Sequence, residues 1–114
     1  MDKLDEDIKT MARHIIQSNE KRKKRIKNNR ASEFDIMAAD AIKTSLCASC
    51  GNIESIQVRE KMQEQIYRSI VSNIPYEHLD VLCGRRQFYE YRTEFITKVA
   101  NGMKMLPTKK NGSS

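Results

Sequence analysis

The sequence contains few of the residues that let a chain turn sharply, with four glycines and two prolines among 114 residues. Long elements joined by few turns are therefore expected, which argues against a β-sandwich or a many-turned α/β fold. Hydrophobic residues make up 39% of the chain, aromatic residues 6%, and tryptophan is absent. This composition predicts a thin core and a single small all-α domain of four to five helices, with no room for a separate cofactor domain.

Long apolar runs and secretion signals are also missing. No window approaches the roughly 18 apolar residues that a membrane span requires. The first residues, MDKLDEDIK, are acidic where a signal peptide would be basic and then apolar. The three cysteines are an odd number, so a disulfide framework is not expected. We therefore expect a cytoplasmic protein with no membrane partner.

Motifs for catalysis are sparse. His14 and His78 are the only histidines, and neither lies in a nucleophile or metalloprotease motif. The chain has no glycine-rich phosphate loop. Glu90 and Glu94 are four residues apart, which is the spacing of neighbours on one helix face, and this interpretation is favoured over a catalytic pair. We expect no enzymatic activity and no cofactor.

The cysteines leave one metal hypothesis open. Cys47, Cys50, His78 and Cys83 are four zinc ligands of acceptable types. A zinc ribbon holds each pair on a tight knuckle, whereas His78 and Cys83 lie within and at the end of a predicted helix. Since cysteine often packs as a small hydrophobe, burial is the favoured interpretation and zinc the alternative.

Hydrophobic spacing predicts the helices. The first carries an apolar stripe that stops at Ile16, and a polar segment over 18–30 follows it as a basic helix or arm with nothing to pack against a core. Ser32 and Asp35 have the spacing of a capping box for a second helix over about 33–48, which Gly51 and Asn52 end. The stripe consists of Leu4, Ile8, Met11 and Ile15 or Ile16.

The remaining segments complete one helical domain over 1–106. A third helix is expected over about 53–72, stopped before Pro75, and a short helix from Pro75 to Leu82 follows. After Gly84, a last helix runs from Arg85 to about Met103. Residues 107–114 contain no apolar side chain after Pro107 and are expected to be a disordered tail.

The net charge of +6 is unevenly distributed. The segment 21–27, KRKKRIK, holds six cations in seven residues and predicts a steep, sequence-independent attraction to phosphates. It is either an arm, a phosphate-contacting helix face or a solvated solubility feature. Its candidate DNA contacts are Lys21, Arg22, Lys23, Lys24, Arg25 and Lys27.

Residues 76–101 have the layout of a helix-turn-helix: a short helix, a turn with Gly84, and a longer amphipathic helix. Arginine and glutamine can pair with base edges in the major groove, and tyrosine suits phosphate contact. The alternative is that helix–glycine–helix is simply how a small helical protein turns. The candidate reading residues are Arg85, Arg86, Gln87, Tyr89 and Arg92, with Phe88, Tyr91 and Phe95 on the inner side.

The run CGRRQFYEYRTEFITKVA resembles the carboxy-terminal, sigma region 4-like helix-turn-helix of small phage-encoded transcriptional regulators of the ArpU and RinA type. In that family a helix of the kind "RR-polar-aromatic-Tyr-x-x-basic" follows the turn, and Arg85 to Tyr89 together with Arg92 match it. The sequence has Cys83-Gly84 where a Ser or Thr often caps the helix. The resemblance implies a DNA-binding regulator of phage genes.

We therefore predict a sequence-specific duplex DNA-binding transcriptional regulator, encoded by a phage or prophage. The alternative is a small phage protein that binds and modulates a host protein or nucleoprotein, such as a polymerase or a defence nuclease. Useful specificity usually needs a dimer or a partner such as RNA polymerase. The stripe on the first helix is a candidate pairing surface for a homodimer, unless it packs within its own chain.

Overall fold

The computed structural model describes residues 6–81 and 83–104, and every regular element in these ranges is helical. No strand occurs in the described ranges, so the predicted all-α fold is confirmed. The elements are α1 (Glu6–Gln17), α2 (Asn19–Lys27), α3 (Glu33–Cys47), α4 (Ile56–Val71), a single 3-10 turn η1 (Tyr76–His78) and α5 (Arg85–Gly102).

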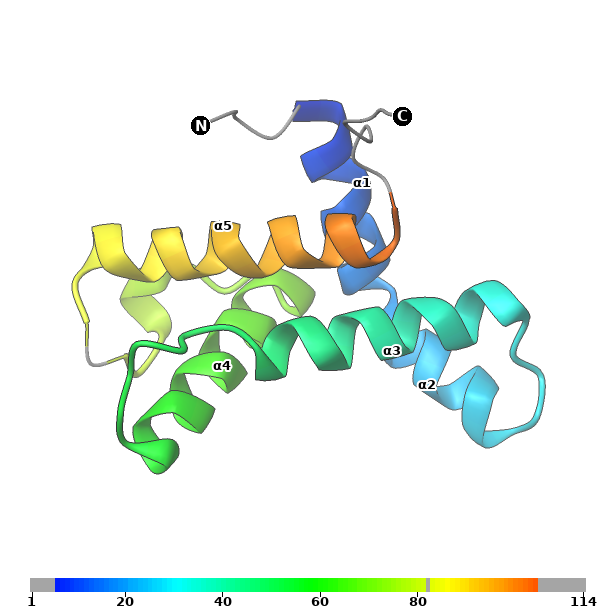
Figure 1. The fold of residues 1–114 in the computed structure, drawn as a ribbon, viewed down its shortest axis with the longest axis horizontal. Helices are drawn as coiled ribbons and strands as arrows, with labels where there is room; N and C mark the ends of the chain where they lie inside the picture. The colour runs from blue at the N-terminus through cyan, green and yellow to red at the C-terminus, as the bar shows by residue number, and fades with distance from the viewer. Residues whose placement is uncertain (1–5, 82, 105–114) are drawn as a thin grey trace, which may run out of the picture.

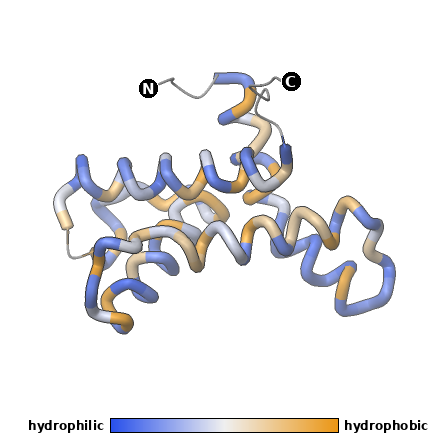
Figure 2. The backbone as a smooth tube through the Cα atoms, viewed as in Figure 1, coloured by the Kyte–Doolittle hydropathy of each residue, from blue (hydrophilic) through white to orange (hydrophobic). Residues whose placement is uncertain are grey.

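The last helix is the centre of the packing. α5 packs against α1, α3 and α4, and α2 packs against α1 and α3. Figure 1 shows α3 and α5 both extending across the molecule, with α2 and α3 forming a hairpin at the end away from the start of α5. In Figure 2, α2 and the loop after it form a markedly hydrophilic stretch.

Apolar side chains from all the helices except α2 make the core. Phe88 and Phe95 of α5 are fully buried and are the largest of its side chains. On burial each such aromatic contributes on the order of 2–3 kcal/mol. The other apolar side chains that are at most 1% exposed are Ala12, Ile16, Ala38, Cys50, Ile66, Ile70, Ile96, Val99 and Ala100.

The predicted stripe on α1 packs mostly within its own chain. Ile16 is buried, and Ile8 and Ile15 are partly buried against the core. Met11 is 55% exposed, and Leu4 lies outside the described residues. Ile8, Ile15 and Ile16 therefore pack within their own chain and do not form a free surface for pairing with a second copy.

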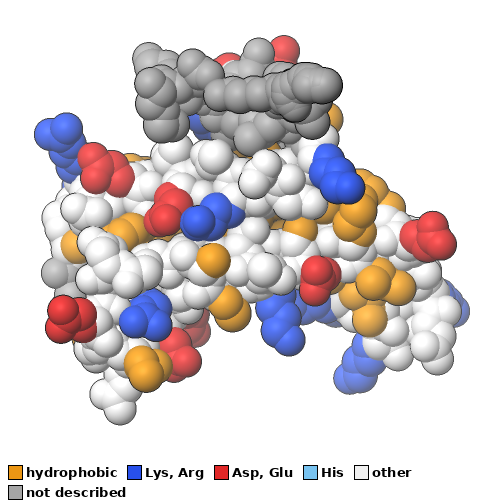
Figure 3. All heavy atoms as spheres, in the orientation of Figure 1, with side chains coloured by type: hydrophobic (Ala, Val, Ile, Leu, Met, Phe, Trp, Pro, Cys, Tyr) orange, Lys and Arg blue, Asp and Glu red, His pale blue; other side chains and the backbone are white. Residues whose placement is uncertain are grey.

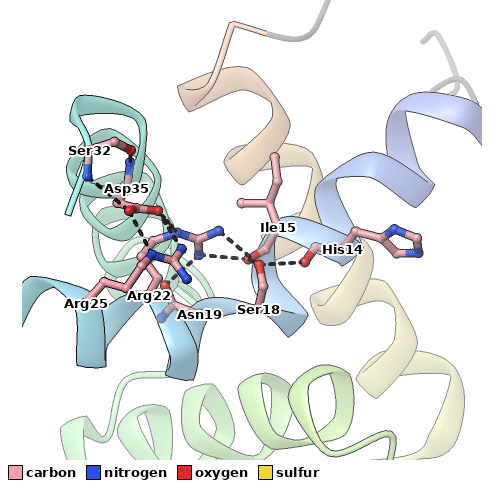
Figure 4. Close-up of polar contacts among 8 residues, drawn as sticks. All are labelled: His14, Ile15, Ser18, Asn19, Arg22, Arg25, Ser32 and Asp35. Carbon is pink, nitrogen blue, oxygen red and sulfur yellow. Dashed lines mark hydrogen bonds and ion pairs between the residues drawn. The ribbon is translucent and has the colours of Figure 1, made fainter. Parts of the chain in front are cut away.

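The chain bends between α1 and α2 at Ser18, and the side chain of Arg22 holds the bend (Figure 4). Its Nη1 donates to the carbonyl of Ile15 at 2.9 Å and its Nη2 to the Ser18 hydroxyl at 3.0 Å. The Ile15 carbonyl belongs to the last turn of α1, where carbonyls have no partner further along the helix. Arg22 is only 2% exposed. The expectation that no side chain of residues 18–30 packs against the core is therefore wrong. The Arg22 guanidinium can be buried because a carbonyl, a hydroxyl and a carboxylate lie around it.

That carboxylate is Asp35, and the predicted capping box around it is confirmed. The Asp35 amide donates to the Ser32 hydroxyl at 3.1 Å, and the Ser32 amide donates to Asp35 Oδ2 at 3.1 Å. Arg25 donates to both carboxylate oxygens, at 2.9 and 2.6 Å, and Arg22 Nε lies 3.7 Å from Oδ1. One side chain thus caps α3 and ties it to α2.

Two helix boundaries differ from the sequence prediction. α3 ends at Cys47, and the left-handed backbone after it falls on Cys50, with φ 61°, rather than on Gly51. α4 starts at Ile56, three residues later than predicted, because the Ser55 hydroxyl caps it by accepting from the Val58 amide at 3.3 Å.

At Gly102 the Cβ of any other residue would lie 3.3 Å from Cβ of Ala41, so the glycine lets α5 approach α3 closely there.

The Asp35 cluster predicts an acid-sensitive fold. Hydrogen bonds from Arg25, then from the Ser32 amide, hold the pKa of Asp35 well below its usual range. A lowered folded-state pKa stabilises the protein above the unfolded pKa of about 4, and this stabilisation is lost as the pH falls below that value. Urea unfolding at a series of pH values should therefore show a free energy of unfolding that decreases below about pH 4.

Asp35→Asn should lower stability at pH 7 and flatten this acid limb. Asp40→Asn, an exposed position on the same helix, is the matched control and should retain the acid limb of the parent. An acid limb that is equally steep in the Asp35→Asn variant would show that another carboxylate is responsible.

Candidate nucleic-acid interface

The first turn of α5 presents the arginines that the sequence singled out. Arg85 pairs with Glu77 of η1 and lies with its guanidinium carbon 5.9 Å from the centre of the Tyr76 ring. Arg86 has a 94% exposed side chain and lies 3.5 Å from Glu90 one turn later. Gln87 is exposed beside them. Arg86 and Gln87 are therefore exposed, although Arg86, like Arg85, lies close to a carboxylate.

The inner side of α5 is as predicted. Phe88, Tyr91 and Phe95 are all buried, and the Tyr91 hydroxyl donates to Asn52 Oδ1 at 2.8 Å. The Tyr76 ring lies 5.6 Å from that of Phe88, and its hydroxyl donates to the Cys83 carbonyl at 2.6 Å. The start of α5 is thus anchored to the segment before it.

A shallow hollow lies on the outer side of α5. Arg86, Tyr89, Glu90 and Thr93 line it. Tyr89 is 38% exposed, and its ring packs edge-on against Phe88 at 5.4 Å. The hollow offers a guanidinium, two hydroxyls and an aromatic face within two helical turns, all of which can contact a nucleic acid, together with the carboxylate of Glu90, which would repel a phosphate.

Arg92 does not continue this outer side. Its Nε donates to the Ser69 hydroxyl of α4 at 3.3 Å, and its guanidinium lies 5.9 Å from the Tyr89 ring. Burial, and then the nearby charge of Arg13, lowers its pKa. Arg92 therefore occupies the junction of α5 with α4, with its Nε engaged by Ser69.

The basic segment 21–27 separates into two kinds of cation. Arg22 and Arg25 belong to the Asp35 cluster, so the prediction that Arg22 contacts DNA is corrected: its side chain is buried. The other four cations are exposed, although Lys23 pairs with Glu20 at 3.3 Å. The cations available for phosphate are Lys21, Lys23, Lys24 and Lys27.

The two basic regions lie apart. In Figure 1, α5 begins at the left end of the molecule and α2 lies at the right. The structure therefore does not bring Arg86 and Gln87 together with the α2 lysines into one patch.

The helix-turn-helix is not confirmed. Where the sequence predicted a short helix to Leu82, η1 covers only Tyr76–His78, and no α-helix occurs in residues 76–81. Leu79 follows with extended backbone, and Leu79 and Val81 pack against the core. The second helix of the predicted motif is present as α5, capped at Gly84 without a side-chain hydrogen bond.

The candidate zinc ligands do not converge. Cys47 and His78 are exposed, Cys50 is buried and Cys83 is half-buried. Within residues 6–81 and 83–104, no group of three or more His, Cys, Asp or Glu side chains is placed to hold a metal ion. Burial of Cys50 in the core follows the favoured interpretation of the sequence.

Two features were not found from the sequence. The charge of Arg13 in α1 contributes to the lowered pKa of Arg92. No motif around Arg13 in the sequence predicts this effect. Phe34, Ile36 and Met37 at the start of α3 are also exposed, with 49%, 57% and 47% of their surface accessible. Figure 3 shows hydrophobic side chains gathered over this half of α3.

Comparison of the chain with models of protein families, with curated proteins and with solved structures gives no match. In the part of the chain that is described, no helix combines the length and apolarity needed to span a bilayer.

The cysteine environments predict unequal thiol reactivity. Burial raises the pKa of Cys50 to about 12 and also raises that of Cys83. Because the thiolate is the reactive form, the exposed Cys47 should react first with a thiol-specific reagent in the native protein. Cys50 should react only after denaturation. Cys47→Ser should remove the fast phase; a fast phase that survives this substitution would place an accessible thiol elsewhere.

Proposed function

We propose that the protein binds duplex DNA in a sequence-specific manner and acts as a transcriptional regulator encoded by a phage or prophage. The outer side of the first two turns of α5 makes the base contacts, through Arg86 and Gln87, with Tyr89 at the adjacent phosphates. The observation that carries this proposal is that these three side chains are exposed on a helix whose inner side is fixed by buried Phe88.

The electrostatics of this end of α5 support an anionic partner. The first turn contains two arginines and no acid, and no side chain caps it. The partial positive charge of a helix amino terminus makes such cations unfavourable by a few tenths of a kcal/mol each. A DNA phosphate at this position would offset that cost and would receive free backbone amides.

The exposed lysines of α2 supply a second contact, of a different kind. Lys21, Lys24 and Lys27 are exposed, and no carboxylate of a described residue forms an ion pair with them. Each phosphate that they neutralise would add to affinity in a manner independent of sequence. The α5 residues are assigned to specificity and the α2 lysines to affinity.

A protein-binding function is the second candidate, and the exposed apolar residues of α3 favour it. Contiguous exposed apolar surface commonly marks a protein interface. A host protein or nucleoprotein, such as RNA polymerase, is the class of partner proposed for this surface, either instead of DNA or alongside it.

The test begins with a selection of bound sequences from random duplex DNA, followed by titrations over a range of salt. Arg86→Ala with Gln87→Ala should weaken binding to the enriched site by about 1–3 kcal/mol per lost base contact and leave binding to random duplex nearly unchanged. Lys21, Lys24 and Lys27 changed together to Gln should weaken both equally and lower the salt slope by about 0.9 per phosphate lost.

Lys43→Gln, an exposed lysine on α3, is the matched charge control. Base reading by α5 is overturned if the Arg86 and Gln87 changes do not affect preference for the enriched site while the lysine changes abolish binding. Absence of duplex binding at low salt overturns the proposed function in favour of the protein-binding candidate.

A further inference from the structure

The outer side of α3 is an exposed stripe that contains apolar residues. Ile36 and Met37 are 57% and 47% exposed near the start of the helix. From Ile36 onward, exposed residues recur at steps of four, three and four, a spacing that places them on one side of a helix. They are Ile36, Asp40, Lys43 and Cys47. The buried residues of α3 lie on the opposite side, so this stripe faces away from the core.

The stripe carries charges of both signs that the chain itself does not neutralise. Asp40 and Lys43 form no ion pair with any described residue, and neither does Glu33 at the start of the helix. Figure 3 shows acidic side chains on both sides of the exposed hydrophobic group. Such carboxylates repel the phosphates of a nucleic acid. A matching surface would supply a cation opposite Asp40 and a carboxylate opposite Lys43.

A second copy of the same stripe supplies both. Two subunits related by a two-fold axis use the same surface, which is therefore complementary to itself. If two α3 helices pair antiparallel about an axis between Asp40 and Lys43, each Asp40 lies level with Lys43 of the second copy. The same register places each Ile36 level with Cys47 of the second copy, so these two side chains flank the charge pairs. Parallel pairing would oppose like charges instead.

We propose that the outer side of α3 is a dimer interface, where a second copy of this chain pairs antiparallel through Ile36, Asp40 and Lys43. The complementarity of the stripe with itself, in charge and in its exposed apolar residue, carries this inference. The interface does not rest on DNA binding. It gives to a second copy the α3 surface that the host protein of the protein-binding candidate would otherwise occupy.

Sedimentation of the full chain over a range of concentrations, without DNA, tests the interface. The parent should show a monomer–dimer equilibrium. Asp40→Lys and Lys43→Asp should each raise the dissociation constant by about tenfold or more, because each change opposes like charges at both ends of the two-fold pair. Glu64→Lys, at an exposed acid of α4, makes the same change of net charge as Asp40→Lys and should leave the equilibrium unchanged.

Mixing the two charge variants separates pairing from an effect on folding. Asp40→Lys and Lys43→Asp chains should each sediment as monomers alone and as a dimer together, because every level of the interface then holds one cation and one anion. A folding defect would not be rescued in this way. Ile36→Ser should weaken the dimer, whereas Ile56→Ser, at a 63% exposed isoleucine of α4, should not.

The proposal is overturned if the parent is monomeric at every concentration, which would leave the α3 surface to the protein-binding candidate. It is equally overturned if the single charge variants dimerise like the parent or if their mixture stays monomeric. A dimer that binds no duplex contradicts the proposed regulator and leaves this interface standing. Lys43→Gln and Asp40→Asn serve as controls in the other experiments at concentrations where the parent sediments as a monomer.

Discussion

The buried guanidinium of Arg22 is the contact on which the arrangement of the first three helices depends. It reaches back to the Ile15 carbonyl and the Ser18 hydroxyl, and it faces the carboxylate of Asp35. Burial lowers the pKa of Arg22, and the charge of Asp35 opposes that effect. Because removing one partner of such a cluster leaves a buried charge uncompensated, the bend between α1 and α2 and the hairpin of α2 with α3 are coupled.

This coupling extends to the candidate interface through α1. The same helix that ends at the Arg22 cluster packs Ile16 into the core, and it carries Arg13, whose charge contributes to the lowered pKa of Arg92 in α5.

The sequence was sufficient for features that local chemistry decides. The spacing of Phe88, Tyr91 and Phe95 gave the inner side of α5, and Ser32 with Asp35 gave the start of α3, because periodicity and capping act within one or two turns. The burial of Arg22 was not predictable, since its ion-pair partner Asp35 is thirteen positions away and a run of cations normally indicates a solvated segment. The inward turn of Arg92 depends on Ser69 of another helix, and the segment 76–81 folds onto the core instead of continuing as a helix.

For the proposed DNA-binding function, the separation of the α5 amino end from α2 determines how much duplex one chain would cover. The molecule is 41 Å along its longest axis, compared with about 34 Å for one turn of duplex DNA. A single chain lying along the duplex would therefore cover about a dozen base pairs. In the proposed function, α5 would contact bases at one place along this stretch, and the α2 lysines would contact backbone phosphates at another.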